Sequence, residues 1–240
     1  MSNMRAIILA GGKGVRLKPY TTLIPKPLVP LGGERSVVEL VVMQLAKAGF
    51  TRITLAVSHF SDLVMAYFGD GKKWGVNIDY SLEQKPLNTI GPLTLIRDLP
   101  EDFLVMNSDV LCNLDFKKFF KEHVRTKSQI SVAACQRDSV VDFGVLKYDS
   151  NNYLSEFYEK PVYRFEVSMG VYCFKRSVIS KLLKNHSYGF DQLMIDGIKN
   201  KSKIRIHPFN GFWLDIGRPE DYQYADDHYL EIKKKLGLKA

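Results

Sequence analysis

The sequence predicts an α/β fold, a Rossmann-like three-layer sandwich with helices on both sides of a mostly parallel but mixed central sheet. Short apolar runs of strand type alternate with segments of helical periodicity through the first half of the chain. The first run, 6–10, is aliphatic and β-branched, as expected of a strand buried on both faces of a parallel sheet. In the second half several strand-like runs follow one another, which makes the predicted sheet mixed rather than purely parallel.

Local stop and start signals bound the elements. The helix expected at 36–48 ends at Gly49, and the helix expected at 61–68 ends at Gly69. Pro92 fits the first turn of a helix opening at Gly91. Further helices are expected at 115–125, 177–183 and 190–200, with a closing helix from Pro219. The expected strands are 6–10, 53–57, 78–82, 103–106, 130–135, 144–148, 154–159, 170–174 and 204–208.

Length, composition and charge narrow the function. The 240 residues, 45% hydrophobic and 25% charged, suffice for a sizeable core, and we expect a single domain over 1–240. The net charge is +8, but no basic stripe with interleaved aromatic residues is present. We therefore expect small anionic substrates as partners, and neither nucleic acid nor a membrane.

The cysteines and the N-terminal segment indicate an intracellular protein. Cys112, Cys135 and Cys173 are widely spaced and lack the spacing of a zinc or redox motif, so we expect reduced core residues. No segment is apolar enough to cross a bilayer, and residues 1–5 lack a signal-peptide pattern. The expected location is the cytoplasm.

A glycine-rich stretch, 9–33, follows the first strand directly. The glycines within 11–14 allow backbone N–H groups to close on an anion as a nest, and Arg16 and Lys26 add permanent positive charge. Two better-known glycine motifs do not fit. The dinucleotide fingerprint fails because its third glycine position is Leu17, and the P-loop pattern occurs nowhere. The stretch is therefore predicted to bind a polyphosphate.

Two aspartates are candidate metal ligands. Asp109 follows the apolar run 103–106 and is separated from it only by the polar pair 107–108. Ligands of open α/β sheets bind at the carboxyl ends of strands. A carboxylate facing a bound anion needs a cation between them, which points to Mg²⁺. Asp215, embedded in apolar residues, is the candidate second ligand. An acid after a strand is also a common turn or helix cap, so the pattern alone leaves both interpretations open.

These motifs together resemble those of the sugar-1-phosphate nucleotidylyltransferases. The segment 9–32 matches the pattern L-A-G-G-x-G-x-R-L-x-P-L-T followed by P-K-P-x-x-P, with Tyr20 in place of leucine. The segment 107–109 resembles N-G-D, with serine for glycine, and 213–217 resembles W-x-D-x-G. The resemblance implies a glycosyltransferase-A-like fold and Mg²⁺ held by the two aspartates.

The same resemblance implies roles for further residues. Arg16 and Lys26 would be catalytic, Asp109 and Asp215 would bind the metal, and the segment 83–91, close to E-x-x-P-L-G-T-A-G, favours GTP as in mannose-1-phosphate guanylyltransferases. Asn88 replaces the usual glycine there, so it either contacts base or ribose or takes a left-handed turn. The implied nucleotide-binding residues are Leu9, Ala10, Gly11, Gly12, Lys13, Gly14, Glu83, Pro86, Asn88, Thr89 and Ser108. The implied sugar-phosphate-binding residues are Gly144, Glu159, Lys160 and Ser168, the last where many members have asparagine.

The predicted reaction transfers a nucleoside monophosphate from an NTP to a sugar 1-phosphate, giving an NDP-sugar and pyrophosphate. Two alternatives remain. A nucleotide-sugar-dependent glycosyltransferase shares the fold but normally carries a D-x-D motif, and no D-x-D triplet occurs in this sequence. A catalytically silent regulatory relative would not be expected to retain Arg16, Lys26 and both aspartates. A homodimer is the default assembly for an enzyme of this size.

Overall fold

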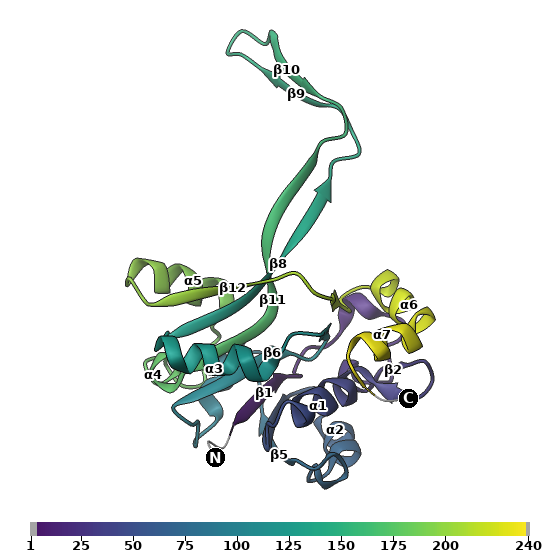
Figure 1. Cartoon of the computed structure of the whole chain (residues 1–240), viewed down its shortest axis with the longest axis vertical. Helices are drawn as coiled ribbons and strands as arrows, with labels where there is room; N and C mark the ends of the chain where they lie inside the picture. The colour runs from purple at the N-terminus through teal and green to yellow at the C-terminus, as the bar shows by residue number, and fades with distance from the viewer. Residues whose placement is uncertain (1–3, 239–240) are drawn as a thin grey trace.

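A seven-stranded sheet forms the centre of the computed structural model, which describes residues 4–238 (Figure 1). The strands in spatial order are β12 (Ile204–Phe209), β8 (Ile130–Val140), β11 (Val162–Lys175), β6 (Asp102–Asn107), β1 (Arg5–Leu9), β4 (Arg52–Val57) and β5 (Asn77–Leu82). β11 runs antiparallel to both of its neighbours, β6 and β8. The other neighbouring pairs are parallel, which confirms the predicted mixed and mostly parallel sheet.

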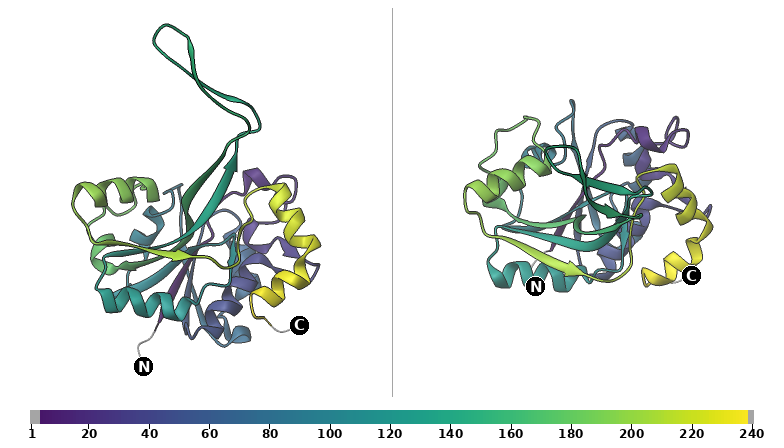
Figure 2. Two further views of the ribbon diagram at one scale, coloured as in Figure 1. Left: turned by 45° about the horizontal axis from the view of Figure 1, so that its top comes forward. Right: turned by 90° about the horizontal axis from the view of Figure 1, so that it is seen from above.

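Helices cover both faces of this sheet (Figure 2). On one face pack α1 (Val37–Lys47), α2 (Ser61–Phe68), α3 (Phe116–Thr126), α6 (Pro219–Asp227) and α7 (Tyr229–Lys235). On the other pack the 3₁₀ helix η4 (Gly91–Leu95), α4 (Arg176–Ile179) and α5 (Phe190–Lys199). Because successive strand side chains point to opposite faces, Ala6 and Ile8 of β1 join the first core and Ile7 joins the second. The three-layer arrangement is thus confirmed.

Capping side chains fix where two helices begin. The Ser36 hydroxyl accepts a hydrogen bond from the Glu39 N–H at 3.1 Å at the start of α1. The Asp115 carboxylate accepts one from the Lys118 N–H at 2.9 Å at the start of α3. Both residues satisfy backbone donors that a first helical turn leaves unpaired.

The shorter elements are η1 (Val15–Leu17), η2 (Lys26–Leu28), η3 (Lys72–Trp74), β2 (Pro30–Leu31), β3 (Arg35–Ser36), β7 (Val110–Cys112), β9 (Val145–Tyr148), β10 (Leu154–Tyr158) and β13 (Trp213–Asp215).

Three predicted helices differ in extent. The helix expected after Gly91 is only the 3₁₀ helix η4, because the N–H groups of Ile90 and Gly91 both donate to the Tyr188 carbonyl and tie the segment to that neighbouring loop. The helix expected at 177–183 stops after the four residues of α4. The closing helix is two helices, α6 and α7, because His228 between them leaves the helical conformation with φ −106° and ψ 20°.

The largest difference lies in β8 and β11, which extend far beyond the predicted 130–135 and 170–174. Their ladder continues outward to the pair Val140 and Val162, and the hairpin of β9 and β10 stands at its end. We call residues 136–167 the arm; Figure 1 shows it projecting from the rest of the molecule. Each arm strand supplies the other's hydrogen-bond partners, which a strand-by-strand reading of polar sequence does not reveal.

The three cysteines are buried with free thiols, as expected of core residues. Burial raises the pKa of the Cys112 thiol to about 12, so that thiol is unreactive at neutral pH. Within residues 4–238, no helix combines the length and the apolar character needed to cross a membrane.

Candidate active site

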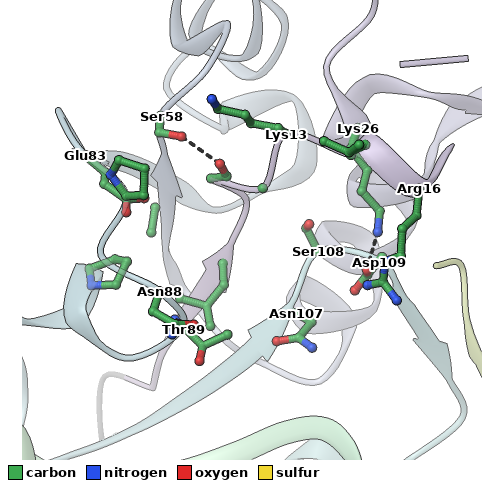
Figure 3. A pocket seen from close by; sticks show the side chains of 18 of the residues that line it. Lys13, Arg16, Lys26, Ser58, Glu83, Asn88, Thr89, Asn107, Ser108 and Asp109 are labelled. Atoms are coloured by element: carbon green, nitrogen blue, oxygen red, sulfur yellow. Dashed lines mark hydrogen bonds and ion pairs between the residues drawn. The ribbon is translucent and has the colours of Figure 1, made fainter. Parts of the chain in front are cut away.

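A cavity of about 500 Å³ opens at the carboxyl ends of the parallel strands β1, β4 and β6, where open α/β sheets bind ligands. Figure 3 shows Arg16 and Lys26 beside Asp109 on one side of it, and Glu83 and Asn88 on the other. The cavity is lined by Leu9, Gly11, Gly12, Lys13, Gly14, Val15, Arg16, Lys26, Ala56, Ser58, Glu83, Pro86, Asn88, Thr89, Pro92, Asn107, Ser108, Asp109 and Gly217.

The glycine loop is held in shape by side chains around it. The Ser58 hydroxyl donates to the Gly11 carbonyl at 2.6 Å, and the Thr21 hydroxyl donates to the Gly14 carbonyl at 2.7 Å. Gly14 has a φ of +64°, and a Cβ there would lie 2.8 Å from Cγ2 of Thr21. The loop therefore requires glycine at this position.

The segment from Glu83 to Thr89 closes the other side of the cavity. A Cβ on Gly11 would lie 2.8 Å from Oε2 of Glu83, so the two segments are in close contact. Burial raises the pKa of Glu83, and the hydrogen bond that its carboxylate accepts from the Leu87 N–H lowers it, with a net upward shift. This wall of the cavity thus presents a partly buried carboxylate.

Asn88 takes the left-handed turn conformation, with a φ of +65°. Its Oδ1 accepts a hydrogen bond from the Thr89 N–H at 2.9 Å, and the Thr89 hydroxyl accepts one from the Phe190 N–H at 2.9 Å. Of the two interpretations left open by the sequence, the turn role is the one this geometry displays. Asn88 also lines the cavity, so its amide remains within the site.

The two aspartates, 106 residues apart in sequence, lie side by side. β7 pairs antiparallel with β13 so that Asp215 stands opposite Val110, and the Ile216 N–H donates to the Asp109 carbonyl at 2.9 Å. Burial and the negative charge of Asp109 raise the pKa of Asp215, while Lys26 and Arg16 lower it, leaving a net upward shift. Folding has thus brought together two carboxylates that repel each other.

Positive charge compensates these carboxylates. Lys26 forms an ion pair with Asp109, in which the two side chains are only 13% and 16% exposed. Arg16 and Asp215 approach the same point, because a Cβ on Gly217 would lie 3.7 Å from Nη1 of Arg16 and 3.5 Å from Oδ1 of Asp215. Both predicted catalytic cations therefore lie at the carboxylate pair.

The donor set at this edge fits Mg²⁺. Residues 4–238 contain no cluster of three or more His, Cys, Asp and Glu side chains that could hold a metal. Mg²⁺ does not require one, because it is commonly bound by one or two carboxylates together with substrate phosphates and water. Asp109 and Asp215 beside an anion-binding loop provide that combination.

Three predicted residues lie next to the cavity without lining it. Ala10 is buried beneath the loop and its N–H donates to the Ala56 carbonyl at 2.8 Å. Ser168 stands at the base of the arm, where its hydroxyl donates to the Tyr172 hydroxyl at 3.1 Å. Asp215 lines an adjoining cleft together with Arg137 and Trp213.

The remaining sugar-side residues are not at the cavity of their own chain, contrary to expectation. Gly144, Glu159 and Lys160 gather at the joint between the ribbon of β8 and β11 and the hairpin of β9 and β10. A Cβ on Gly144 would lie 3.4 Å from Oε2 of Glu159, and the Lys160 ammonium lies 3.1 Å from a carboxylate oxygen of Asp142. The ladder pairing of the arm places this cluster well outside the body.

Six lining residues escaped the sequence prediction: Val15, Ala56, Ser58, Pro92, Asn107 and Gly217. Ser58 directly follows β4, so the rule that identified Asp109 could have found it. Asn107 ends β6 and packs closely on Gly170, where a Cβ would lie 2.7 Å from Nδ2 of Asn107. Gly217 carried a signal only as the last residue of the W-x-D-x-G pattern.

Comparisons with known proteins identify the family of the chain. Residues 5–232 match the family described as nucleotidyl transferase. The chain is 34% identical to the mannose-1-phosphate guanyltransferase of Neurospora crassa, over 98% of this chain and 67% of that protein. It is 32% identical to the protein of the same name from Schizosaccharomyces pombe, over 97% of this chain and 66% of that protein. The chain thus spans about two thirds of the length of these relatives.

A solved structure resembles the whole fold. The crystal structure of HddC from Yersinia pseudotuberculosis complexed with GMP-PN superimposes with a TM-score of 0.72 at 25% identity. The match covers 94% of this chain and 99% of that one.

Proposed function

Because the chain belongs to the nucleotidyl transferase family, we propose that it transfers a nucleoside monophosphate from an NTP to a sugar 1-phosphate, releasing pyrophosphate. Its fold is the glycosyltransferase-A-like, Rossmann-type fold of nucleotidyltransferases. The observation that carries the proposal is the meeting of an anion-binding glycine loop, two cations and two carboxylates at one sheet edge. A magnesium polyphosphate matches all three groups.

The chain's own residues supply binding and charge neutralisation. The backbone N–H groups of 11–14 and the guanidinium of Arg16 bind the β- and γ-phosphates, and Arg16 stabilises the departing pyrophosphate. Lys26 neutralises charge where the α-phosphate meets the sugar phosphate. Asp109 and Asp215 would hold Mg²⁺, which when bound neutralises charge on phosphate oxygens.

The bonds exchanged at phosphorus need no general base. An oxygen of the sugar phosphate, already an anion, attacks the α-phosphorus in line, and the bond from that phosphorus to the β-phosphate oxygen breaks. Pyrophosphate leaves with the electron pair and the NDP-sugar remains. The site is therefore built for positioning and electrostatics, since no histidine lines the cavity among residues 4–238.

GTP is the proposed nucleotide. The segment 83–91 resembles that of guanylyltransferases, and the relatives from Neurospora crassa and Schizosaccharomyces pombe carry that name. HddC was crystallised with GMP-PN, a guanosine nucleotide by its name. A hexose 1-phosphate is the proposed acceptor, because these relatives are named for mannose 1-phosphate.

A pyrophosphate-release assay tests this function. It crosses GTP, ATP, UTP, CTP and dTTP with a panel of hexose, heptose and amino-sugar 1-phosphates. We expect the highest kcat/KM with GTP, and a loss of about a hundredfold in an Arg16→Ala control, since a cation on the transferring phosphates is removed. A clear preference for UTP, CTP or dTTP would contradict the assignment of the base. Absence of turnover with every pair would contradict the reaction and favour the silent-relative alternative.

A further inference from the structure

The arm, residues 136–167, exposes an unusual amount of apolar surface. Eleven large apolar side chains between positions 140 and 165 are 42–77% exposed, Phe143 and Tyr153 the most. This 26-residue stretch holds eleven of the 25 such side chains found exposed in the described part of the chain. Concentrated exposed apolar surface marks an interaction site, and an isolated two-stranded ribbon is at best marginally stable in water.

The arm also carries the residues that the cavity lacks. The cluster of Gly144, Glu159 and Lys160 is formed at the joint of the arm, and Lys160 there is 59% exposed with only Asp142 as its ion-pair partner among the described residues. The cavity of the same chain is complete on its polyphosphate side but receives none of the three. A ready-made sugar-phosphate cluster and an open cavity are thus held apart.

The geometry of the ladder prevents the arm from reaching its own cavity. From the pair Ala134 and Ser168 to the pair Val140 and Val162, the strands advance six residues, roughly 20 Å at 3.3 Å per residue. The pairing continues to the joint, where the Val141 N–H donates to the Pro161 carbonyl at 3.1 Å. Folding back in the same chain would break these hydrogen bonds, whereas reaching a second molecule breaks none.

The body offers a surface suited to an incoming arm. The loop after the glycine loop exposes Leu23 and Ile24, and Val15 on the cavity wall is 62% exposed. Charge favours the same contact. The arm has six acidic and four basic residues and therefore a net charge of −2. Since the whole chain carries +8, the rest of the chain carries +10.

We infer that two copies of this chain exchange arms, so that the joint of each arm completes the sugar-phosphate side of the other copy's cavity. A two-fold axis makes the exchange reciprocal and closes the assembly as a dimer. Glu159 and Lys160 then act in trans, with Arg16, Lys26 and both aspartates supplied by the receiving copy. The inference rests on the proposed function for the role of the joint, but not for the exchange itself.

Mixed dimers of two impaired variants test the exchange. Lys160→Ala and Arg16→Ala chains with different tags are co-expressed, and the mixed dimer is isolated by both tags. The Lys160→Ala homodimer should lose about tenfold in kcat/KM for the sugar 1-phosphate, and Arg16→Ala about a hundredfold. In the mixed dimer, the cavity of the Lys160→Ala chain keeps Arg16 and receives the arm of the Arg16→Ala chain, which keeps Lys160. One of the two sites therefore has all of its residues. We expect about half of the wild-type activity.

Arms acting on their own chains would give a different result. Each site of the mixed dimer would then keep one substitution, and the activity would be about a twentieth of wild type, which would overturn the exchange. Lys147→Ala is the matched control, because this lysine lies on the hairpin but pairs with Glu156 at 2.8 Å, outside the joint cluster. It should keep wild-type activity.

A second measurement needs no turnover. In sedimentation velocity, wild type should be a dimer, and a variant with 141–161 replaced by two glycines should be a folded monomer with wild-type helical circular dichroism. This replacement keeps the ladder up to Val140 and Val162. A monomeric wild type, or a variant that stays dimeric, would overturn the inference. An inactive wild type would contradict the proposed function alone, since the dimer measurement stands apart from it.

Discussion

Replacement of either Asp109 or Asp215 by asparagine should lower kcat severely while leaving the fold intact. Asp109 and Asp215 lie side by side through the pairing of β7 and β13, so each amide would remove one of two carboxylates from the same place. Removing charge stabilisation from a transferring phosphoryl group costs about a hundredfold in kcat, equivalent to roughly 2.7 kcal/mol. Since burial raises the pKa of Asp215, the neutral amide should be tolerated there without loss of stability.

The effects of the two substitutions on kcat should not multiply in the double variant. Residues that serve one metal act as a unit, so the double variant should be within a few-fold of either single variant rather than ten thousandfold below wild type. The assay is pyrophosphate release against Mg²⁺ concentration for wild type, both single variants and the double variant. Asp221→Asn is the matched control: its carboxylate also raises the pKa of Asp215, yet it accepts the Arg218 N–H at 3.2 Å and should change kcat less than twofold.

Three results would refute the shared-metal reasoning. Full turnover by wild type in excess EDTA would show that no divalent cation is needed. An Asp215→Asn enzyme with unchanged kcat and unchanged Mg²⁺ dependence would remove Asp215 from the site. Multiplicative losses in the double variant would assign the aspartates to independent roles.

Further substitutions probe the loop, the turn and the fold. Gly14→Ala should raise KM for NTP about tenfold and lower the free energy of unfolding in urea by at least about 1 kcal/mol. The reason is that φ at this position is +64° and that a Cβ would meet Thr21. A wild-type KM would refute this prediction. Asn88→Gly should leave KM for GTP within about twofold, since its Oδ1 is engaged by its own turn, and a large rise would show a base contact. The hydrogen bond from Arg5 lowers the pKa of Asp98 to about 2, so Asp98 stabilises the fold above about pH 4 and loses that contribution as pH falls toward 2. Asp98→Asn should therefore lower the free energy of unfolding by about 1 kcal/mol at pH 7, a value discounted because the side chain is 57% exposed, and by much less at pH 2, where Asp98 is partly protonated. Equal losses at both pH values would contradict this linkage.

The lining of the cavity was predictable in large part, because it follows from local rules. Glycines, Arg16 and Ser108 follow apolar runs in sequence, and parallel strands bring their carboxyl ends to one edge whatever the details of the helices. Ser58 obeys the same rule and was missed only because a lone serine after a strand carries no chemistry of its own. Its function is structural: it holds the Gly11 carbonyl at 2.6 Å.

The sequence indicated which residues the resemblance assigns to the sugar phosphate, but not where they lie in the fold. The resemblance selected Gly144, Glu159 and Lys160, and the structure groups these residues together at the arm joint. No local pattern contains the length of β8 and β11, because residues 136–139 are polar and become a strand only by pairing with 163–166. Local sequence also carries no information on which copy's cavity a joint will meet.

The ion pair between Lys26 and Asp109 has a consequence for how substrate binds. Lys26 cannot neutralise Asp109 and an incoming phosphate at once, so a bare polyphosphate entering the cavity would leave Asp109 uncompensated beside Asp215, whose pKa burial and Asp109 already raise. A polyphosphate that arrives with a divalent cation brings the missing positive charge with it. NTP and Mg²⁺ should thus bind with positive coupling, each raising the affinity of the other by the same factor, and the coupling should weaken when Asp109 is replaced by asparagine.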